Sequence, residues 1–529
     1  MNMRLSRRQR DPGRSQRWRV GSVIAVCVLI VAGGLSFLAV RNHRAAHPPA
    51  SSSDPAAAAV HVTPPDPVCG NKSILAGGPA KAPAGAVAVA AGDNSGINWA
   101  QPNTTYWFAP GLHTLGSSQF DQIDPAAGST FIGAPGAVLD GRQTNLYAFG
   151  GNAAHVRISY LTVQNFGPTG ANQNQGVVNH DSAASWTIDH STLQDNAGAG
   201  TMLGSDNTLN YNCLKNNQQY GFNAYSTTGP VNLVITHNEI VGNDTYNWEK
   251  HQVGCGCTGG GKFWYVTGAV VTHNWVHGNH SVGLWADTNN RGFEIDDNYI
   301  EDNFNYGLIY EISYNAQIRN NVFERNGLGA GPSNQGFPTG AIYISESGSD
   351  PRVAGPYGKQ FAITGNTFVN NWGGVILWEN SNRYCNSPAN TSSGACTLVA
   401  PKSVTTSSCS AKTIARNPYY ADCRWKTQNV QVSHNDFDFD PAALGSGCTA
   451  KNMCGFQGLF SEYGSFPDWS PYHGAAVEKH ITLQQNNHFA DNTYNGPWRF
   501  MIMSEGNVVS WSAWRGAPYR QDQGSSSAG

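Results

Sequence analysis

The sequence predicts an all-β fold, a solenoid of the parallel β-helix type, preceded by a transmembrane helix. Three observations favour the solenoid. The chain has 529 residues, whereas a single compact core rarely grows past about 300 residues. Only 13% of the residues are charged and 60 are Gly, which is typical of turn-rich β-structure and excludes a helical bundle or coiled coil. The third observation is a short motif built on Asn that recurs along the chain.

The N-terminus carries the predicted transmembrane helix. Residues 20–40 contain no charge, and seven Arg precede them. A stretch of this length spans a bilayer, and the basic segment 1–19 is expected to stay in the cytoplasm. The sequence therefore predicts a signal anchor that holds the protein in the cell membrane by a single pass, with the C-terminal part outside. The alternative is a cleaved signal peptide and a secreted protein.

Composition divides the rest of the chain. Residues 41–67 form a Pro/Ala/Ser linker, 68–520 are predicted to be the β-helix domain, and 521–529 a disordered tail. The 485 residues after Arg44 carry a net charge of −11. This charge excludes nucleic acid as a partner and weakly disfavours a strongly anionic polysaccharide.

Cysteine usage fits an exported chain. Ten of the 11 Cys follow the predicted span, and an even number in an exported protein predicts disulfides. The short separations 385/396, 409/423 and 448/454 suggest pairs that close loops. For Cys255 and Cys257 a disulfide is favoured over a metal site, because no second pair follows at zinc-finger spacing.

The recurring motif is Asn, any residue, an apolar residue, two residues of any kind, and Asn. Its copies begin at Asn212, 238, 274, 298, 321, 366 and 487, with degenerate copies at Ser191 and Asn435. A Gly often follows, and then a strand with alternating apolar residues. A basic turn of 21–24 residues, lengthened by loop insertions, accounts for the intervals.

Three short strands per turn, with Asn and Gly at fixed corners, describe the coil of a parallel β-helix. Asn tolerates the left-handed backbone that such a corner needs, and stacked amides can hydrogen-bond along the axis. A leucine-rich horseshoe lacks its fixed Leu positions here, and a propeller needs a longer period. His237 and His273 precede the motif at equivalent points, where a stacked packing column is favoured over a metal site.

Several stretches resemble the right-handed parallel β-helix proteins of the pectin-lyase-like superfamily, and more narrowly an exported bacterial group typical of actinomycetes. They are NTTYWFAPGLHTL at 103–115, TFIGAPGAVLDG at 130–141, GGGKFW at 259–264, GLWADTNN at 283–290 and GLIYEISYNAQIRNN at 307–321. The resemblance implies a right-handed coil. It leaves the activity open, because the superfamily includes lyases, hydrolases, epimerases and binding proteins.

Counting from the corner Gly places two carboxylates in register. Asp287 lies four residues after Gly283, and Glu311 four residues after Gly307. Both are expected to face outward on neighbouring coils, about 4.8 Å apart. Like charges at this spacing need a shared proton, a metal or a cation; the alternative is a solvated acidic stripe. The acidic line is expected to continue through Glu346 and Glu379.

Further candidate residues surround these carboxylates. The insertion at 244–268 carries Glu249, a candidate third catalytic carboxylate, and ends in Lys262 and Trp264. A braced surface loop with incidental charges is the alternative for this segment. The expected substrate-binding residues are Lys262, Trp264, Trp285, Tyr314 and Arg291, because aromatic rings beside carboxylates suit a sugar face and the cations suit its hydroxyl or acidic groups.

The sequence therefore predicts an extracytoplasmic protein whose partner is a polysaccharide or other glycan. The leading hypothesis is a glycoside hydrolase that uses two of Asp287, Glu311 and Glu249. The first alternative is a polysaccharide lyase or uronate epimerase, for which Ca²⁺ or a basic side chain would neutralise the uronate. The second is a non-catalytic glycan-binding surface protein. No cofactor is indicated by a motif, and Ca²⁺ stays open as a candidate metal.

Overall fold

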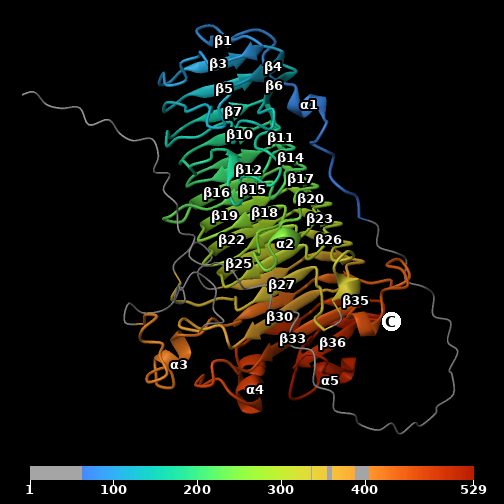
Figure 1. The fold of residues 1–529 in the computed structure, drawn as a ribbon. Helices are drawn as coiled ribbons and strands as arrows, with labels where there is room; N and C mark the ends of the chain where they lie inside the picture. Colours follow the sequence, from blue (N-terminus) through green and yellow to red (C-terminus); the bar gives the residue numbers. More distant parts are fainter. Residues whose placement is uncertain (1–61, 335, 354–359, 388–403, 529) are drawn as a thin grey trace, which may run out of the picture.

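The computed structural model describes residues 62–334, 336–353, 360–387 and 404–528. Within these residues the chain forms a parallel β-helix (Figure 1), in which successive coils stack along one axis and build three sheets of 13, 14 and 11 strands. Strand pairs within the sheets are parallel, except that β37 pairs with β36 in the antiparallel direction. The predicted solenoid is thus confirmed.

Each complete coil contributes one strand to each sheet in turn, and the third sheet begins only at β9. Sheet 1 contains β1 Val87–Val89, β3 Thr105–Phe108, β5 Thr130–Gly133, β7 Arg157–Ser159, β10 Thr187–Asp189, β13 Thr208–Asn210, β16 Val231–Thr236, β19 Thr267–Thr272, β22 Arg291–Asp296, β25 Tyr314–Arg319, β28 Phe361–Thr364, β31 Val430–Ser433 and β34 His488–Ala490. Sheet 2 contains β2 Gly92–Asp93, β4 Gly111–Thr114, β6 Ala137–Asp140, β8 Thr162–Gln164, β11 Thr192–Gln194, β14 Cys213–Lys215, β17 Glu239–Val241, β20 Trp275–His277, β23 Tyr299–Glu301, β26 Val322–Glu324, β29 Thr367–Val369, β32 Asp436–Asp438, β35 Thr493–Asn495 and β38 Ser526–Ala528.

Sheet 3 contains β9 Gly176–Val178, β12 Ala199–Leu203, β15 Phe222–Ala224, β18 Gly261–Phe263, β21 Leu284–Ala286, β24 Leu308–Glu311, β27 Ile342–Ser345, β30 Val375–Asn380, β33 Phe456–Glu462, β36 Arg499–Met503 and β37 Val508–Val509. The helices are short and lie outside the coils: α1 Lys72–Leu75, α2 Trp248–His251, η2 Gly331–Ser333, α3 Tyr419–Asp422, η3 Ala450–Asn452, α4 Ala475–Leu483 and α5 Trp511–Arg515. Figure 1 shows α2 in front of sheet 3, and α4 and α5 at the C-terminal end of the stack.

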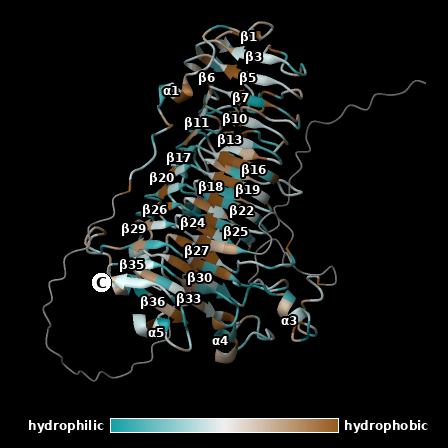
Figure 2. Ribbon diagram, turned by 180° about the vertical axis from the view of Figure 1, so that it is seen from behind, coloured by the Kyte–Doolittle hydropathy of each residue, from teal (hydrophilic) through white to brown (hydrophobic). Residues whose placement is uncertain are grey.

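The core is one column of inward-facing side chains. On sheet 1, for example, Leu209, Ile235, Val271, Ile295 and Ile318 follow one another up the stack and are all at most 1% exposed. Figure 2 shows the hydrophobic strand segments running through the middle of the stack, with hydrophilic turns at its margins. Because alternate strand residues face inward, the residues between them face outward. On sheet 3 these outward residues, Trp285 and Ile309 among them, are buried in a second apolar cluster.

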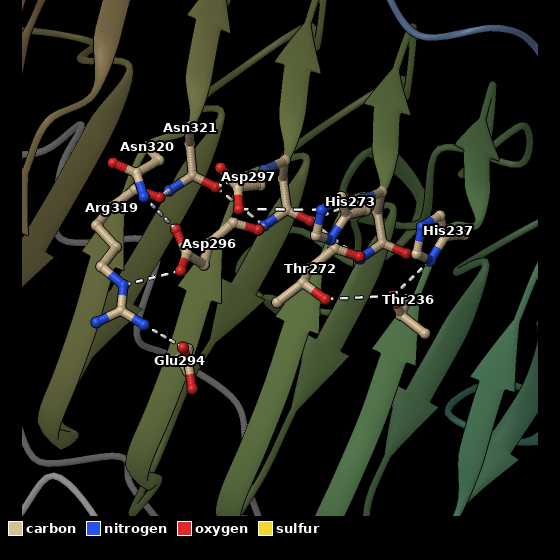
Figure 3. A network of polar contacts seen from close by, with 12 residues as sticks. Thr236, His237, Thr272, His273, Glu294, Asp296, Asp297, Arg319, Asn320 and Asn321 are labelled. Carbon is tan, nitrogen blue, oxygen red and sulfur yellow. Dashed lines mark hydrogen bonds and ion pairs between the residues drawn. The ribbon is translucent and has the colours of Figure 1, made fainter.

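The predicted Asn columns are present at the corners. The side-chain amide of Asn238 donates to Oδ1 of Asn274 at 3.0 Å, and Asn274 donates in turn to Asn298 at 2.9 Å; the same contact continues to Asn321, one of the residues labelled in Figure 3. The copy at 487–492 departs from the prediction. Asn492, its second Asn, continues the column of first Asn residues, whereas Asn487 precedes sheet 1 and binds the backbone of Val430.

A column of rings lies on the outside of the same turn. His237 and His273 stack with ring centroids 4.8 Å apart, and Tyr211 stacks on His237 at 4.6 Å (Figure 3 shows the two His). All three residues have a left-handed backbone, with φ between 54° and 56°. Among the described residues no group of three or more His, Cys, Asp or Glu is placed to hold a metal ion. The packing interpretation of the His column fits this geometry.

The N-terminal segment runs back along sheet 2 before the first coil (Figure 1). A disulfide joins Cys69 to Cys213 in β14, and Glu239 in β17 accepts hydrogen bonds from the backbone N–H of Val68 and Cys69 at 2.8 and 2.7 Å. In the described part of the chain, no helix has the length and apolar character of a membrane span. The span predicted at 20–40 lies outside the described residues.

Three other disulfides follow the sequence spacing. They join Cys255 to Cys257, Cys409 to Cys423, and Cys448 to Cys454, as predicted. Cys385 is disulfide-bonded as well, and Cys396, its predicted partner, lies outside the described residues.

The C-terminal tail is folded, contrary to the disordered tail predicted from residue 521. Strand β38 pairs with β35 and extends sheet 2 by one strand. The Asp522 side chain is fully buried and accepts hydrogen bonds from Trp514 at 2.7 Å and Tyr494 at 3.0 Å. These contacts compensate for the lack of apolar residues in the tail, on which the prediction of disorder rested.

Candidate functional site

The outer face of sheet 3 carries the predicted site. Leu284 and Ala286 of β21 face the core, so Trp285 between them faces outward. Trp285 pairs in the sheet with Lys262 of β18 on one side and Ile309 of β24 on the other. Because Ala286 is opposite Tyr310, Asp287 and Glu311 hold equivalent positions on adjacent coils. This is the register that the spacing from the corner Gly predicts.

Lys262 and Asp287 form an ion pair at the centre of this face. The ammonium Nζ lies 2.9 Å from Oδ2 of Asp287, and the two side chains are only 1% and 13% exposed. The same ammonium lies 3.8 Å from the centroid of the Trp285 ring and 4.7 Å from that of Trp264. A cation held over two indole faces away from water gains from the negative ring faces. The structure thus brings together four of the predicted site residues.

Glu311 lies beside this pair. It was predicted to be open to solvent, and the structure shows it buried. Its side chain is 5% exposed and lies 2.5 Å from Nη1 of Arg383, which also lies 2.8 Å from the carboxylate of Glu346. Burial raises the pKa of the Glu311 carboxyl, and Arg383 acts against this shift. Arg383 lies in the loop after β30, 72 residues after Glu311 in the chain, and its side chain covers this carboxylate.

The rest of the acidic line is also bound by arginines. Glu311 is opposite Ser345 in the sheet, so Glu346 falls one residue beyond the predicted register. Glu379 is buried and lies 2.8 Å from Nε of Arg424. The solvated acidic stripe considered as an alternative is therefore not what the structure shows beyond Asp287.

Glu249 braces a loop rather than facing solvent as a third carboxylate. Its two oxygens accept hydrogen bonds from the backbone N–H of Gly254 and Gly256, the latter at 3.1 Å. The carbonyl of Gly256 accepts a hydrogen bond from the Lys262 ammonium. Residues 249–257, closed by the Cys255–Cys257 disulfide, therefore lie over Lys262; we call them the covering loop.

Arg291 and Tyr314 lie away from these residues. They are opposite each other on sheet 1, in β22 and β25. Tyr314 is fully buried and stacks on Trp425 with ring centroids 6.0 Å apart, so the predicted sugar contact of Tyr314 is wrong. The reason is a sharp turn after Glu311, where Ile312 has a φ of 46° and directs the chain from sheet 3 to sheet 1. Arg291 bonds to Thr267 at 3.0 Å.

Sequence reasoning missed Asp244, a buried carboxyl at the base of the covering loop. Its Oδ1 accepts a hydrogen bond from the backbone N–H of Trp248 at 3.2 Å, and its Oδ2 accepts one from the hydroxyl of Thr258. Burial raises the pKa of Asp244 to about 7. Asp244 directly follows Asn243, the second Asn of the motif copy that begins at Asn238, and this position was the signal in the sequence that could have identified it.

Several buried polar atoms on sheet 3 and in α2 have no hydrogen-bond partner in the described part of the chain. They are Oδ1 of Asn223, which is opposite Lys262 in the sheet, Nε1 of Trp285 and Nε1 of Trp248 in α2. A buried donor or acceptor without a partner is costly. The atoms of Asn223 and Trp285, the two residues that flank Lys262 in the sheet, therefore suit a polar ligand or water.

The chain is similar to known β-helix proteins. The family model described as "Right handed beta helix region" matches residues 175–355 and 256–392. The A-module of the Azotobacter vinelandii mannuronan C-5 epimerase AlgE4 is similar with a TM-score of 0.43 and 15% identity, over 67% of this chain and 87% of that one. The periplasmic alginate epimerase AlgG follows with a TM-score of 0.31, 11% identity, and 68% and 72% coverage.

A third solved structure is the alginate lyase AlyF-OU02 with G6, with a TM-score of 0.32, 15% identity, and 70% and 76% coverage. No curated protein matches the sequence. At these TM-scores and identities the solved structures carry no argument about this chain, whereas the family match agrees with the β-helix described above.

Proposed function

We propose that this protein is a carbohydrate-active enzyme of the lyase or epimerase type, acting on a polysaccharide that contains uronic acid. The observation that carries the proposal is the Lys262–Asp287 pair over Trp285 and Trp264. It joins one cation, one carboxylate and two aromatic faces on one outward surface. This combination supplies what abstraction of a proton next to a sugar carboxylate requires.

The roles follow from the charges. The Lys262 ammonium would take up the charge of the substrate carboxylate, which makes the neighbouring C–H bond more acidic. Asp287 would accept the proton. The resulting carbanion then has two outcomes. It either expels the oxygen at C4, which takes the proton from Asp287 as the chain is cleaved and an unsaturated sugar forms, or it takes a proton from water on the opposite face, which inverts the centre without cleavage, and Asp287 releases its proton to solvent.

Access to this pair requires a movement. Lys262 is 1% exposed, and Gly256 of the covering loop occupies one of its donors. A substrate carboxylate would replace the Gly256 carbonyl on the ammonium, so the covering loop has to lift away. Trp285 and Trp264 would then pack against the sugar ring.

The test is to incubate the full-length protein with alginate, polygalacturonate and hyaluronan. Ultraviolet absorbance would report an unsaturated product, and proton NMR would report inverted uronate without cleavage. Lys262→Met and Asp287→Asn are each expected to lower kcat by about 100-fold or more, the usual contribution of an acid–base group. The control is Asp296→Asn, which breaks a comparable ion pair with Arg319 on sheet 1. The proposal fails if no polymer changes, or if both variants remain as active as the parent.

Hydrolysis is the second candidate, favoured by one observation. Asp287 and Glu311 are in register on adjacent coils, and burial raises the pKa of Glu311 as in a general acid. Against it stands the contact with Arg383, which holds Glu311 away from solvent. New reducing ends without ultraviolet absorbance, lost in Glu311→Gln, would favour hydrolysis over the lyase or epimerase reaction. Glycan binding without any turnover would favour a binding protein.

A further inference from the structure

A hollow of about 270 Å³ lies at the corner where the chain leaves sheet 2 and turns toward sheet 3. It spans three successive coils. Its principal lining residues are His280, Asp302, Phe304, Arg325, Leu328 and Gly329. These residues precede the strands of sheet 3, whereas Asp287 and Glu311 lie at the other end of those strands, so the hollow is separate from the Lys262–Asp287 pair.

Phe304 forms a fixed aromatic platform in this hollow. Its side chain is 51% exposed, yet its backbone is held on both sides. Its N–H donates to the carbonyl of Asn279 at 3.0 Å, and its carbonyl accepts from Ala330 at 2.9 Å. The ring packs on the backbone of Gly329, since a Cβ at that glycine would lie 2.1 Å from a ring carbon. The ring is therefore supported by the protein on one side and left open to solvent elsewhere.

Polar groups stand at the rim of this platform. Nε of Arg325 lies 2.9 Å from Oδ1 of Asp302, with both side chains roughly half exposed, and His280 is exposed beside them. A hollow with an apolar face and a few convergent polar groups is the usual form of a small-ligand site. An ion pair in an exposed position retains donor and acceptor capacity toward a ligand.

We infer that this hollow binds one sugar ring of a polysaccharide, as a second glycan site apart from the proposed catalytic pair. A pyranose presents an apolar C–H face that can pack on the Phe304 ring and hydroxyl groups around its edge that can bond to Arg325, Asp302 and His280. The planar support under Phe304 and the small size of the hollow favour a flat ring over an extended peptide. Such a site would hold a polymer on the protein while another part of it reacts.

Binding of the full-length protein to alginate, polygalacturonate, xylan and pullulan, measured by affinity electrophoresis, tests this inference. Phe304→Ala removes the platform, and Gly329→Ala displaces it, because the new Cβ would collide with the ring. Both variants are expected to bind at least one of the four polymers at least ten-fold more weakly. Two matched controls are expected to bind as the parent does: Phe120→Ala, which removes a ring that is 66% exposed, and Gly96→Ala, where an added Cβ meets nothing within 4 Å.

The inference is overturned if none of the four polymers binds, or if Phe304→Ala and Gly329→Ala bind like the parent while thermal melts show that all variants are folded. Loss of polymer binding in Phe304→Ala, together with retained turnover of short oligosaccharides, would separate this site from the Lys262–Asp287 pair.

Discussion

The guanidinium of Arg383 lies 2.5 Å from the carboxylate of Glu311, which stands 72 residues earlier in the chain. The same nitrogen contacts Glu346, and all three side chains are at most 8% exposed. One cation thus serves two buried carboxylates. The loop that follows β30 is in this way fixed to the outer face of sheet 3.

Arg383→Met should be strongly destabilising. It leaves Glu311 and Glu346 buried without a counter-charge, a situation that typically costs about 3–5 kcal/mol. We expect urea unfolding to show a loss of this size in the free energy of unfolding. Arg319→Met, which removes a guanidinium that is 36% exposed on sheet 1, should cost about 1 kcal/mol or less. Equal effects of the two substitutions would contradict this account.

Asn274→Ala tests the corner column. The amide of Asn274 donates to the carbonyl of Ile235 at 2.8 Å, and its Oδ1 accepts from both nitrogens of Asn238. The substitution leaves buried groups unpaired on two coils, and we expect it to lower the free energy of unfolding by about 2–4 kcal/mol. Gln317→Ala, at a half-exposed position of β25, should change it by less than about 1 kcal/mol. Calorimetric unfolding of the parent and the two variants measures these differences. Equal stability of Asn274→Ala and Gln317→Ala would show that the Asn column does not stabilise the fold.

Asp244 should make stability depend on pH. Its pKa is about 7 in the folded protein and about 4 in an unfolded chain. Between these values the folded state holds a proton that the unfolded state has lost, so this group destabilises the fold progressively as the pH rises from about 4 to about 7. Asp244→Asn mimics the protonated form, and its Tm relative to that of the parent should rise over this range. A constant difference in Tm from pH 4 to 8 would refute the assignment.

The Cys69–Cys213 disulfide should contribute more stability than the Cys448–Cys454 disulfide. The first closes a sequence separation of 144 residues and the second one of 6. In the chain-entropy model these separations correspond to about 5 and about 2 kcal/mol. Paired Cys→Ser variants, compared by denaturant unfolding, should show this order, and the reverse order would exclude an entropic origin.

The periodic part of the molecule was open to prediction from sequence, and the non-periodic part was not. Asn238 and Asn274 repeat because each coil must satisfy the same corner backbone, so their spacing reveals the coil. The register of Asp287 with Glu311 follows from the same spacing. Arg383 contacts Glu311 from a loop that has no repeat, so no spacing in the sequence predicts this contact. Glu249 was predicted to be a catalytic carboxylate. Its actual partners are the backbone N–H groups of Gly254 and Gly256, and residue types do not reveal such contacts.

The attachment of Cys69 to β14 also determines how the molecule would respond to force. A pull on the chain ahead of Cys69 would not peel β1 from the end of the stack, because the disulfide passes the tension directly to the coil that contains Cys213. The strands β1 to β13 would carry no load. The coils that follow, with the Lys262–Asp287 pair and the hollow at Phe304, would bear the tension instead.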